Sequence, residues 1–249
     1  PQDDKSAVKW FRLSAEQGDS DSQYWMGWMY RKGLGVPQDD KTAVKWYILS
    51  AEQGDSDAQN NLGYMYRKGI GAPQDDKTAV KWYRLSAEQG DSDSQYWMGY
   101  MYRKGLGVPQ DDKSAVKWFR LSAEQGDSGA QNNLGYMYRK GLGAPQDDKS
   151  AVKWYRLSAE QGDSGGQFNL GYMYRKGLGV PQDDKTAVKW YILSAEQGDS
   201  DAQNNLGYMY QKGLGAPQDD KTAVKWYILS AEQGDSGAQN NLGYMYRKG

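Results

Sequence analysis

Hydrophobic and polar positions recur along this chain with a period of 36 residues. Cutting the chain at its seven prolines gives seven nearly identical lines, and the last line is three residues shorter than the others. Within each half of a line, apolar and small residues return at three- and four-residue spacing, which is the pattern of one buried helix face. A period of this length is typical of a solenoid of stacked units rather than of one globular core.

The first half of each line predicts one helix. In the third line, residues 73–108, Asp75 and Asp76 can accept hydrogen bonds from the free N–H groups of a helix start. Trp82 and Tyr83 are the largest residues on the apolar face and should fill the gap between successive hairpins. Gly90 supplies a left-handed residue that ends the helix.

The second half of the line predicts a second helix. Ser92 and Gln95 form an S-x-x-Q capping box at its start, and Gly105 ends it. Gly99 lies on the buried side, where it should let the two helices approach closely. Its buried stripe consists of Ser94, Met98, Met101 and Tyr102. The two helices, each about 14 residues and roughly 20 Å long, form an αα-hairpin that buries its aromatic face only by stacking on neighbours.

Composition removes most catalytic and metal chemistry. The chain has no Cys and no His, so it lacks thiolate nucleophiles, zinc-thiolate sites and the usual general base. The 31 basic and 32 acidic residues are interleaved, so no basic stripe favours nucleic acid, and no apolar run is long enough for membrane insertion. The acidic clusters lack the spacing of a calcium loop and are interpreted as helix caps. We therefore expect no enzyme activity, cofactor or metal.

The repeated strings resemble a known family. A-V-K-W-Y-x-L-S-A-E-Q-G, followed by A-Q-N-N-L-G-Y-M-Y-x-K-G-x-G-V/A-P-Q-D, is similar to the Sel1-like repeat, a relative of the tetratricopeptide repeat. The resemblance covers all seven lines, so residues 1–249 are predicted to form a single array with units starting at 1, 37, 73, 109, 145, 181 and 217. It implies an all-α, right-handed superhelix of αα-hairpins with the Asp-Ser…Arg-Lys-Gly helices on the concave side. It also implies an interaction scaffold without catalysis.

Twenty-four of the 36 positions are identical in every line that reaches them, and several of the others share one helix face. After an invariant Gln comes a variable pair, with an aromatic residue one turn further on, and these positions lie three and four residues apart. By family geometry this face points into the groove. The candidate groove residues are Tyr24, Trp25, Trp28, Asn60, Asn61, Tyr64, Tyr96, Trp97, Tyr100, Asn132, Asn133, Tyr136, Phe168, Asn169, Tyr172, Asn204, Asn205, Tyr208, Asn240, Asn241 and Tyr244.

Two interpretations of this face remain open. One is drift after recent duplication, since the Val or Ala before each proline alternates and partly repeats every 72 residues. The other is recognition of a protein or extended peptide, with Tyr and Trp as anchors and Asn carboxamides pairing with a peptide backbone. The same residue types could also stack on sugar rings, although nothing in the spacing favours that ligand.

The two ends of the array lead to an alternative function. No polar capping helix covers either end, so the chain is either part of a longer array or contacts other chains there. Head-to-tail self-assembly would repeat the junction that the units already make with each other, and such a contact builds filaments. The candidate end-to-end contact residues are Trp10, Phe11, Leu242, Met245 and Tyr246. The localisation of the protein is not predicted.

Overall fold

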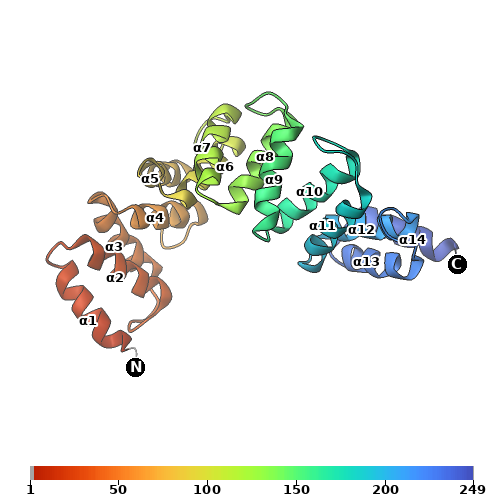
Figure 1. Ribbon diagram of the computed structural model, residues 1–249. Helices are drawn as coiled ribbons and strands as arrows, with labels where there is room; N and C mark the ends of the chain where they lie inside the picture. The colour runs from red at the N-terminus through yellow and green to blue at the C-terminus, as the bar shows by residue number, and fades with distance from the viewer. Residues whose placement is uncertain (1–2, 249) are drawn as a thin grey trace. The chain divides into compact units, whose positions relative to one another are not determined.

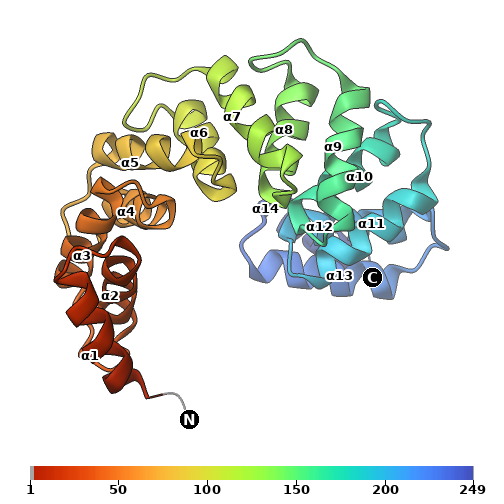
Figure 2. The ribbon, with the colours of Figure 1, turned by 60° about the vertical axis from the view of Figure 1, so that its left-hand side comes forward.

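The chain folds into α-helices joined by turns and loops (Figures 1 and 2). The computed structural model describes residues 3–248, so Pro1 and Gly249, the outer bounds of the predicted array, lie outside the described residues. The chain divides into two compact units, Pro1–Gln125 and Gly126–Gly249. The first contains α1 (Asp4–Ala15), α2 (Ser20–Lys32), α3 (Asp40–Glu52), α4 (Ser56–Lys68), α5 (Asp76–Glu88), α6 (Ser92–Lys104) and α7 (Asp112–Glu124). The second contains α8 (Ser128–Lys140), α9 (Asp148–Glu160), α10 (Ser164–Lys176), α11 (Asp184–Glu196), α12 (Ser200–Lys212), α13 (Asp220–Glu232) and α14 (Ser236–Lys248). These fourteen helices in the described part confirm the predicted all-α fold.

The helix ends follow the sequence closely, with one correction. Asp75 caps α5 as predicted, and Gly90 and Gly105 take left-handed conformations with φ of +101° and +68°. The predicted capping box is wrong, because the N-cap of α6 is Asp91 rather than Ser92. The Asp91 side chain accepts from the Ser94 backbone N–H at 2.7 Å. An acidic side chain also suits the positive end of the helix better than a hydroxyl does.

Gln95, the other half of the predicted box, is buried and joins two repeats. Its Nε2 donates to the Ala87 carbonyl at 3.1 Å, and its Oε1 accepts from Gln125 Nε2 at 2.7 Å. Gln59 is held in the same way by Ala51 and Gln89. Equivalent Gln–Gln bonds link Gln53 to Gln23, Gln161 to Gln131, Gln197 to Gln167 and Gln233 to Gln203. This glutamine ladder explains why one Gln of each even helix never varies, since losing it would leave a buried carbonyl unsatisfied.

The glycine in the middle of each even helix makes room for a ring from the next odd helix. A Cβ placed on Gly99 would lie 2.6 Å from Cδ1 of Phe119, which projects from α7. Gly27 faces Tyr47 and Gly63 faces Tyr83 in the same manner, and Gly171 faces Tyr191. Close approach was predicted, but the approaching group is an aromatic ring rather than a helix backbone.

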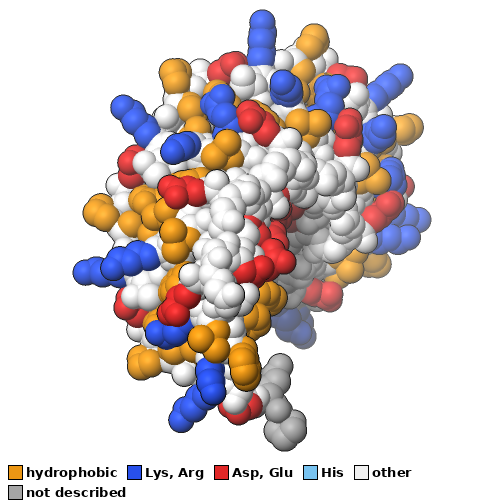
Figure 3. Space-filling model, turned by 90° about the vertical axis from the view of Figure 1, so that its left-hand side faces the viewer, with side chains coloured by type: hydrophobic (Ala, Val, Ile, Leu, Met, Phe, Trp, Pro, Cys, Tyr) orange, Lys and Arg blue, Asp and Glu red, His pale blue; other side chains and the backbone are white. Residues whose placement is uncertain are grey.

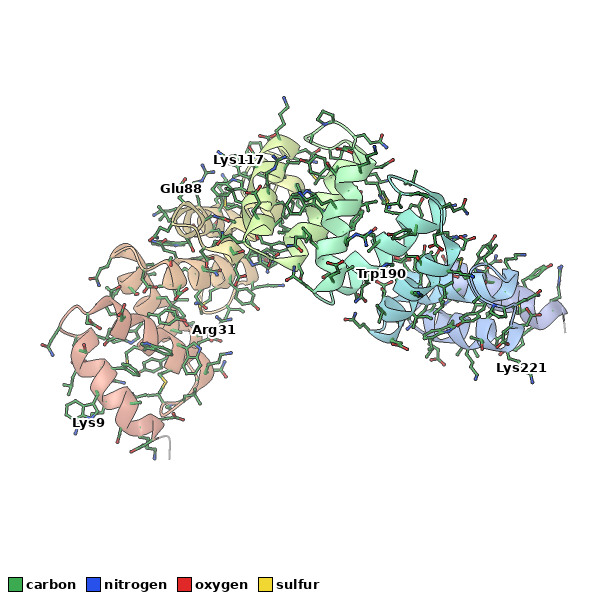
Figure 4. All side chains as sticks on the ribbon, viewed as in Figure 1. Lys9, Arg31, Glu88, Lys117, Trp190 and Lys221 are labelled. Atoms are coloured by element: carbon green, nitrogen blue, oxygen red, sulfur yellow. The ribbon has the colours of Figure 1, made fainter. Side chains whose placement is uncertain are left out.

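Trp82 and Tyr83, which were both expected to fill the gap between hairpins, differ in burial, and so do their equivalents in the other lines. At the Tyr83 position, Phe11 of the first line is half-buried, and the rings of the other lines are completely buried: Tyr47, Tyr83, Phe119, Tyr155, Tyr191 and Tyr227 are all 0% exposed. Trp82 is 7% exposed, whereas Trp10 is 65% exposed and other tryptophans at this position, including the labelled Trp190, are half-buried (Figure 4). The expectation that both rings fill the core therefore holds for the Tyr or Phe and only partly for the Trp.

The N-caps of the odd helices give the fold a defined pH dependence. The hydroxyl of Thr42 donates to Asp39 at 2.6 Å, and this bond, helped by backbone N–H groups, lowers the pKa of the Asp39 carboxyl. The pKa of Asp75, Asp183 and Asp219 is lowered for the same reason. Because the folded pKa lies below the unfolded value near 3.8, these caps stabilise fully above that pH. The stabilisation is lost as pH falls through the lowered pKa.

We expect the denaturant midpoint of unfolding to drop as pH is lowered below about 4. Burial raises the pKa of Asp55 and Asp199, so these two carboxyls act in the opposite direction and favour the fold when protonated. Replacing the four cap threonines by valine should flatten the acid-induced loss, since the cap pKa values then return toward their ordinary range. The replaced residues are Thr42, Thr78, Thr186 and Thr222. An unchanged pH profile in this variant would contradict the assignment.

Candidate functional site: the groove face of the even helices

The candidate groove residues share one face of the even-numbered helices, which we call the groove face. Its residues in α2, for example, are Tyr24, Trp25, Trp28 and Arg31. Most of the candidates are half-buried, while Trp25, Asn240 and Tyr244 are exposed. The groove face contains small hollows in the second unit. One of about 140 Å³ is lined by Arg175, Asn204, Asn205, Tyr208 and Asn241. Another of about 530 Å³ is lined by Gln239, Asn240, Asn241, Gly243, Tyr244 and Arg247.

The carboxamides of this face already donate within the chain. Asn60 Nδ2 donates to Asp91, the N-cap of α6, at 3.2 Å, and Asn61 Nδ2 donates to the Asp57 carbonyl at 2.8 Å. In the second unit, Asn204 Nδ2 donates to Asp235, and Asn241 Nδ2 donates to Asn204 Oδ1. The bonds of Asn60, Asn204 and Asn241 therefore tie successive repeats together, whereas the Asn61 bond stays within α4, and one donor of each of these groups is spent inside the protein.

An arginine row, which the sequence reasoning missed, runs along the same face. The guanidinium carbon of Arg31 lies 4.9 Å from the ring centroid of Tyr64 in the next repeat, and its Nη1 donates to Asn61 Oδ1 at 2.7 Å. Arg175 repeats this geometry with Tyr208 at 4.7 Å and Asn205. These arginines were not among the candidate groove residues predicted from the sequence. Their spacing, three residues after Trp28 and its equivalents, was a signal for the groove face.

The buried tyrosines lie beneath this row. No hydrogen-bond partner reaches the hydroxyls of Tyr47, Tyr83 and Tyr191. Burial raises the pKa of Tyr191 to about 12, and the neighbouring Arg175 opposes that rise. In α12 a glutamine replaces the arginine, and Tyr227 OH donates to Gln211 Oε1 at 3.0 Å. The groove floor thus consists of guanidinium groups stacked on rings, with an aromatic layer below them.

The structure places the end-to-end candidates in unequal positions. Trp10 and Tyr246 are 65% and 66% exposed, and Phe11 and Leu242 are half-buried. Met245 is 7% exposed and packs with Ala223, Tyr227 and Ala238 in the core of the second unit. Figure 3 shows hydrophobic side chains scattered among charged ones on the side that carries α1. An end-to-end contact stays a prediction, with Trp10 and Tyr246 as its accessible residues.

Within residues 3–248, no helix combines the length and apolar character needed to cross a bilayer. In that part of the chain, no three His, Cys, Asp or Glu side chains gather where they could hold a metal ion.

The Sel1 repeat signature matches the chain in consecutive segments, 1–19, 20–55, 56–91, 92–127, 128–163, 164–199, 200–235 and 236–249. The chain belongs to the Sel1 repeat family. The register of the matches begins each full Sel1 repeat at an even helix, as the resemblance implied, so the even helix is the first helix of the repeat. Sel1 repeat proteins are scaffolds that are typically non-catalytic and generally bind proteins.

Solved structures agree with this assignment. A protective antigen of uropathogenic Escherichia coli with the Sel1-like repeat fold is 45% identical, with a TM-score of 0.92. The match covers 99% of this Sel1 repeat chain but only 53% of the antigen, so the chain spans about half the length of that relative. A Sel1 repeat protein of Oxalobacter formigenes is 33% identical, with a TM-score of 0.79 and coverage of 92% of this chain and 97% of that one. No curated protein sequence matches the chain.

Proposed function

We propose that this Sel1 repeat chain is a non-catalytic scaffold that binds an extended peptide or protein segment along its groove face. The observation that carries the proposal is the regular pattern of rings and guanidinium groups on successive even helices. Arg31 with Tyr64 and Arg175 with Tyr208 show the pattern in each unit. Trp, Tyr and Arg are the residues that most often dominate protein interfaces.

We expect the rings to contribute more to binding than the carboxamides. Asn60, Asn61 and Asn204 already donate to groups of the chain, so a peptide backbone gains only their remaining hydrogen-bonding capacity. Trp25 and Tyr244, in contrast, are 40% and 52% exposed and offer apolar area to a ligand. A partner would bury these rings and use the amide and guanidinium groups to orient its backbone and polar side chains.

The absence of catalysis in the proposal rests on the family and on composition. Sel1 repeat proteins are typically non-catalytic, and this chain has neither His nor Cys. Its carboxylates, lysines and tyrosines recur at structural positions in every line, so no single constellation is distinguished from its copies.

The proposal predicts a large effect of one substitution. Peptides selected from a random displayed library against the full chain provide the ligand, and isothermal titration calorimetry provides its affinity. Trp25→Ala should weaken binding by about 2 kcal/mol, roughly 30-fold, because an exposed indole is lost from the contact area. Trp97 is a less direct probe, since its ring is half-buried and packs on Tyr83 within the chain.

The matched control lies on an odd helix. Leu49 is 45% exposed on α3 and belongs to the same unit as Trp25, so Leu49→Ala removes a similarly accessible apolar side chain outside the groove face. The selected peptide should bind this variant as tightly as the original chain. If Leu49→Ala weakens binding and Trp25→Ala does not, the groove face is not the binding surface.

A further inference from the structure

Arg139, at the end of α8, lacks the hydrogen bond that its equivalent Arg31 makes on the groove face. Arg31 Nη1 donates to Asn61 Oδ1 at 2.7 Å, so the group that this guanidinium takes up within the chain is a planar oxygen. Asn169 is the equivalent acceptor for Arg139, but its Nδ2 donates to Asn132 Oδ1 at 3.0 Å instead. Among the described residues, the guanidinium group of Arg139 donates no hydrogen bond, and its Nε is buried without a partner.

Arg139 borders a hollow of about 210 Å³ in the second unit. Helices α8 and α10 lie side by side there, with α9 between them in the chain (Figure 1). The hollow lies between the fourth and fifth lines, so complete lines precede and follow it in the sequence. A molecule of liquid water takes about 30 Å³, so this volume has room for a side chain. Its other lining residues are Lys140, Gln146, Asp148, Tyr172 and Leu178.

The lining of the hollow carries more positive than negative charge. Arg139 and Lys140 supply two cations, and Asp148 supplies one carboxylate. Oδ1 of Asp148 is buried without a hydrogen-bond partner, so neither cation is bonded to that oxygen. The adjacent Asp147 is engaged in the cap of α9, where the backbone N–H and the hydroxyl of Ser150 donate to it at 3.1 and 2.6 Å. The excess of positive charge favours an anionic ligand.

Aromatic rings hold the guanidinium group of Arg139 from two repeats. Its carbon lies 5.1 Å from the ring centroid of Tyr172 and 5.7 Å from that of Tyr136. Contact with ring faces fixes a guanidinium group and leaves the N–H groups at its rim available for hydrogen bonds. A planar fork of donors matches the two oxygens of a carboxylate better than it matches other anions of the same charge.

We propose that this hollow binds the side-chain carboxylate of an aspartate or glutamate in the partner peptide, with Arg139 as its hydrogen-bond donor and Lys140 as a second cation. The inference rests on the proposed peptide-binding function and adds the chemistry of one residue of the ligand. The carboxylate takes the place that Asn61 Oδ1 has beside Arg31. Its charge makes the hydrogen bond shorter and stronger than one to a carboxamide.

The test uses N-acetylglutamate N-methylamide as the probe and the Arg139 Nε–H signal of the ¹⁵N-labelled full chain as the readout. The signal is assigned by its loss in Arg139→Lys. It should shift progressively with the probe, with half-saturation on the order of 10–100 mM for one charge-assisted contact. N-acetylglutamine N-methylamide, which has the same shape without the charge, should leave it unmoved at equal ionic strength. N-acetylglycine, which offers only a terminal carboxylate, should shift it more weakly.

Two variants serve as controls within the same unit. Arg175 already donates to Asn205, so its Nε–H signal should shift much less than that of Arg139. In Asn205→Ala this acceptor is removed, and the Arg175 signal should gain a response to the probe. Asp148→Asn keeps the shape of the hollow and removes its one negative charge, so half-saturation of the Arg139 signal should occur at about threefold lower concentration.

Four results would overturn the inference: no shift of the Arg139 signal, an equal shift with the glutamine probe, a stronger response to N-acetylglycine, or weaker binding of the probe in Asp148→Asn. Because the probe is a single blocked amino acid, its failure leaves the peptide-affinity result of Trp25→Ala untouched. If the probe binds but the peptide affinity falls in Leu49→Ala and not in Trp25→Ala, the proposed function is rejected and the carboxylate site is kept.

Discussion

Replacing Tyr191 by alanine should destabilise the second unit by about 3–5 kcal/mol, the range observed when a large buried ring is removed. The Tyr191 side chain is 0% exposed and lies over Gly171, where it packs with Leu206 and Ala195 in one core cluster. Because repeats depend on their neighbours, the cavity should lower the denaturant midpoint of the entire unit. Guanidinium unfolding followed by circular dichroism measures this midpoint.

Replacing the same residue by phenylalanine separates packing from hydrogen bonding. The Tyr191 hydroxyl has no hydrogen-bond partner, and Phe119 occupies the equivalent position in the first unit, so Tyr191→Phe should change the midpoint little. Tyr227→Phe should cost about 1 kcal/mol, because it breaks the bond to Gln211. Equal effects of the two phenylalanine variants would contradict the hydrogen-bond assignment, and a mild Tyr191→Ala would contradict the packing assignment.

Replacing Gly99 by alanine should destabilise the first unit by about 3 kcal/mol, near the upper end of the usual cost of overpacking. The added Cβ would lie 2.6 to 2.8 Å from three atoms of the Phe119 ring, and that ring is itself completely buried. Because the ring is completely buried, we expect α6 and α7 to move apart to accommodate the added methyl group. The denaturant midpoint of unfolding again provides the measurement.

Gly243 offers a matched control at the equivalent position of α14. A Cβ placed there meets no atom within 4 Å, so Gly243→Ala adds only the higher helix propensity of alanine. It should stabilise the helix by up to roughly 1 kcal/mol. The same substitution thus has opposite signs at two copies of one position. If both variants were destabilised equally, contact with the ring would not explain why every line has a glycine at this position.

The helix pattern was predictable because it depends on local chemistry. Asp75, Gly90 and Gly105 act within one or two turns of their own positions, so spacing alone located the helix ends to within a residue. Gln95 was assigned to a cap because its spacing from Ser92 fits that motif. Its actual partners, Ala87 and Gln125, come from two other helices, and no local pattern identifies them.

The candidate site shows the same limit. Spacing placed Trp25, Asn61 and their equivalents on one face, but it did not show which polar groups were already engaged. Asn61 is bound by Arg31 from the preceding repeat, 30 residues away, and that pairing requires two helices in contact. Arg67, which lies over the Trp97 ring, likewise comes from the preceding repeat, so the pattern within one line does not show this contact.

Photo-cross-linking tests the central claim most directly. A benzoylphenylalanine introduced at Tyr64, on the groove face of α4, should cross-link to the selected peptide, because that ring would contact the bound ligand. The same group at Leu49, on exposed α3 surface in the same unit, should not cross-link. Cross-linking at Leu49 without cross-linking at Tyr64 would contradict the account, because the peptide would then bind outside the groove face.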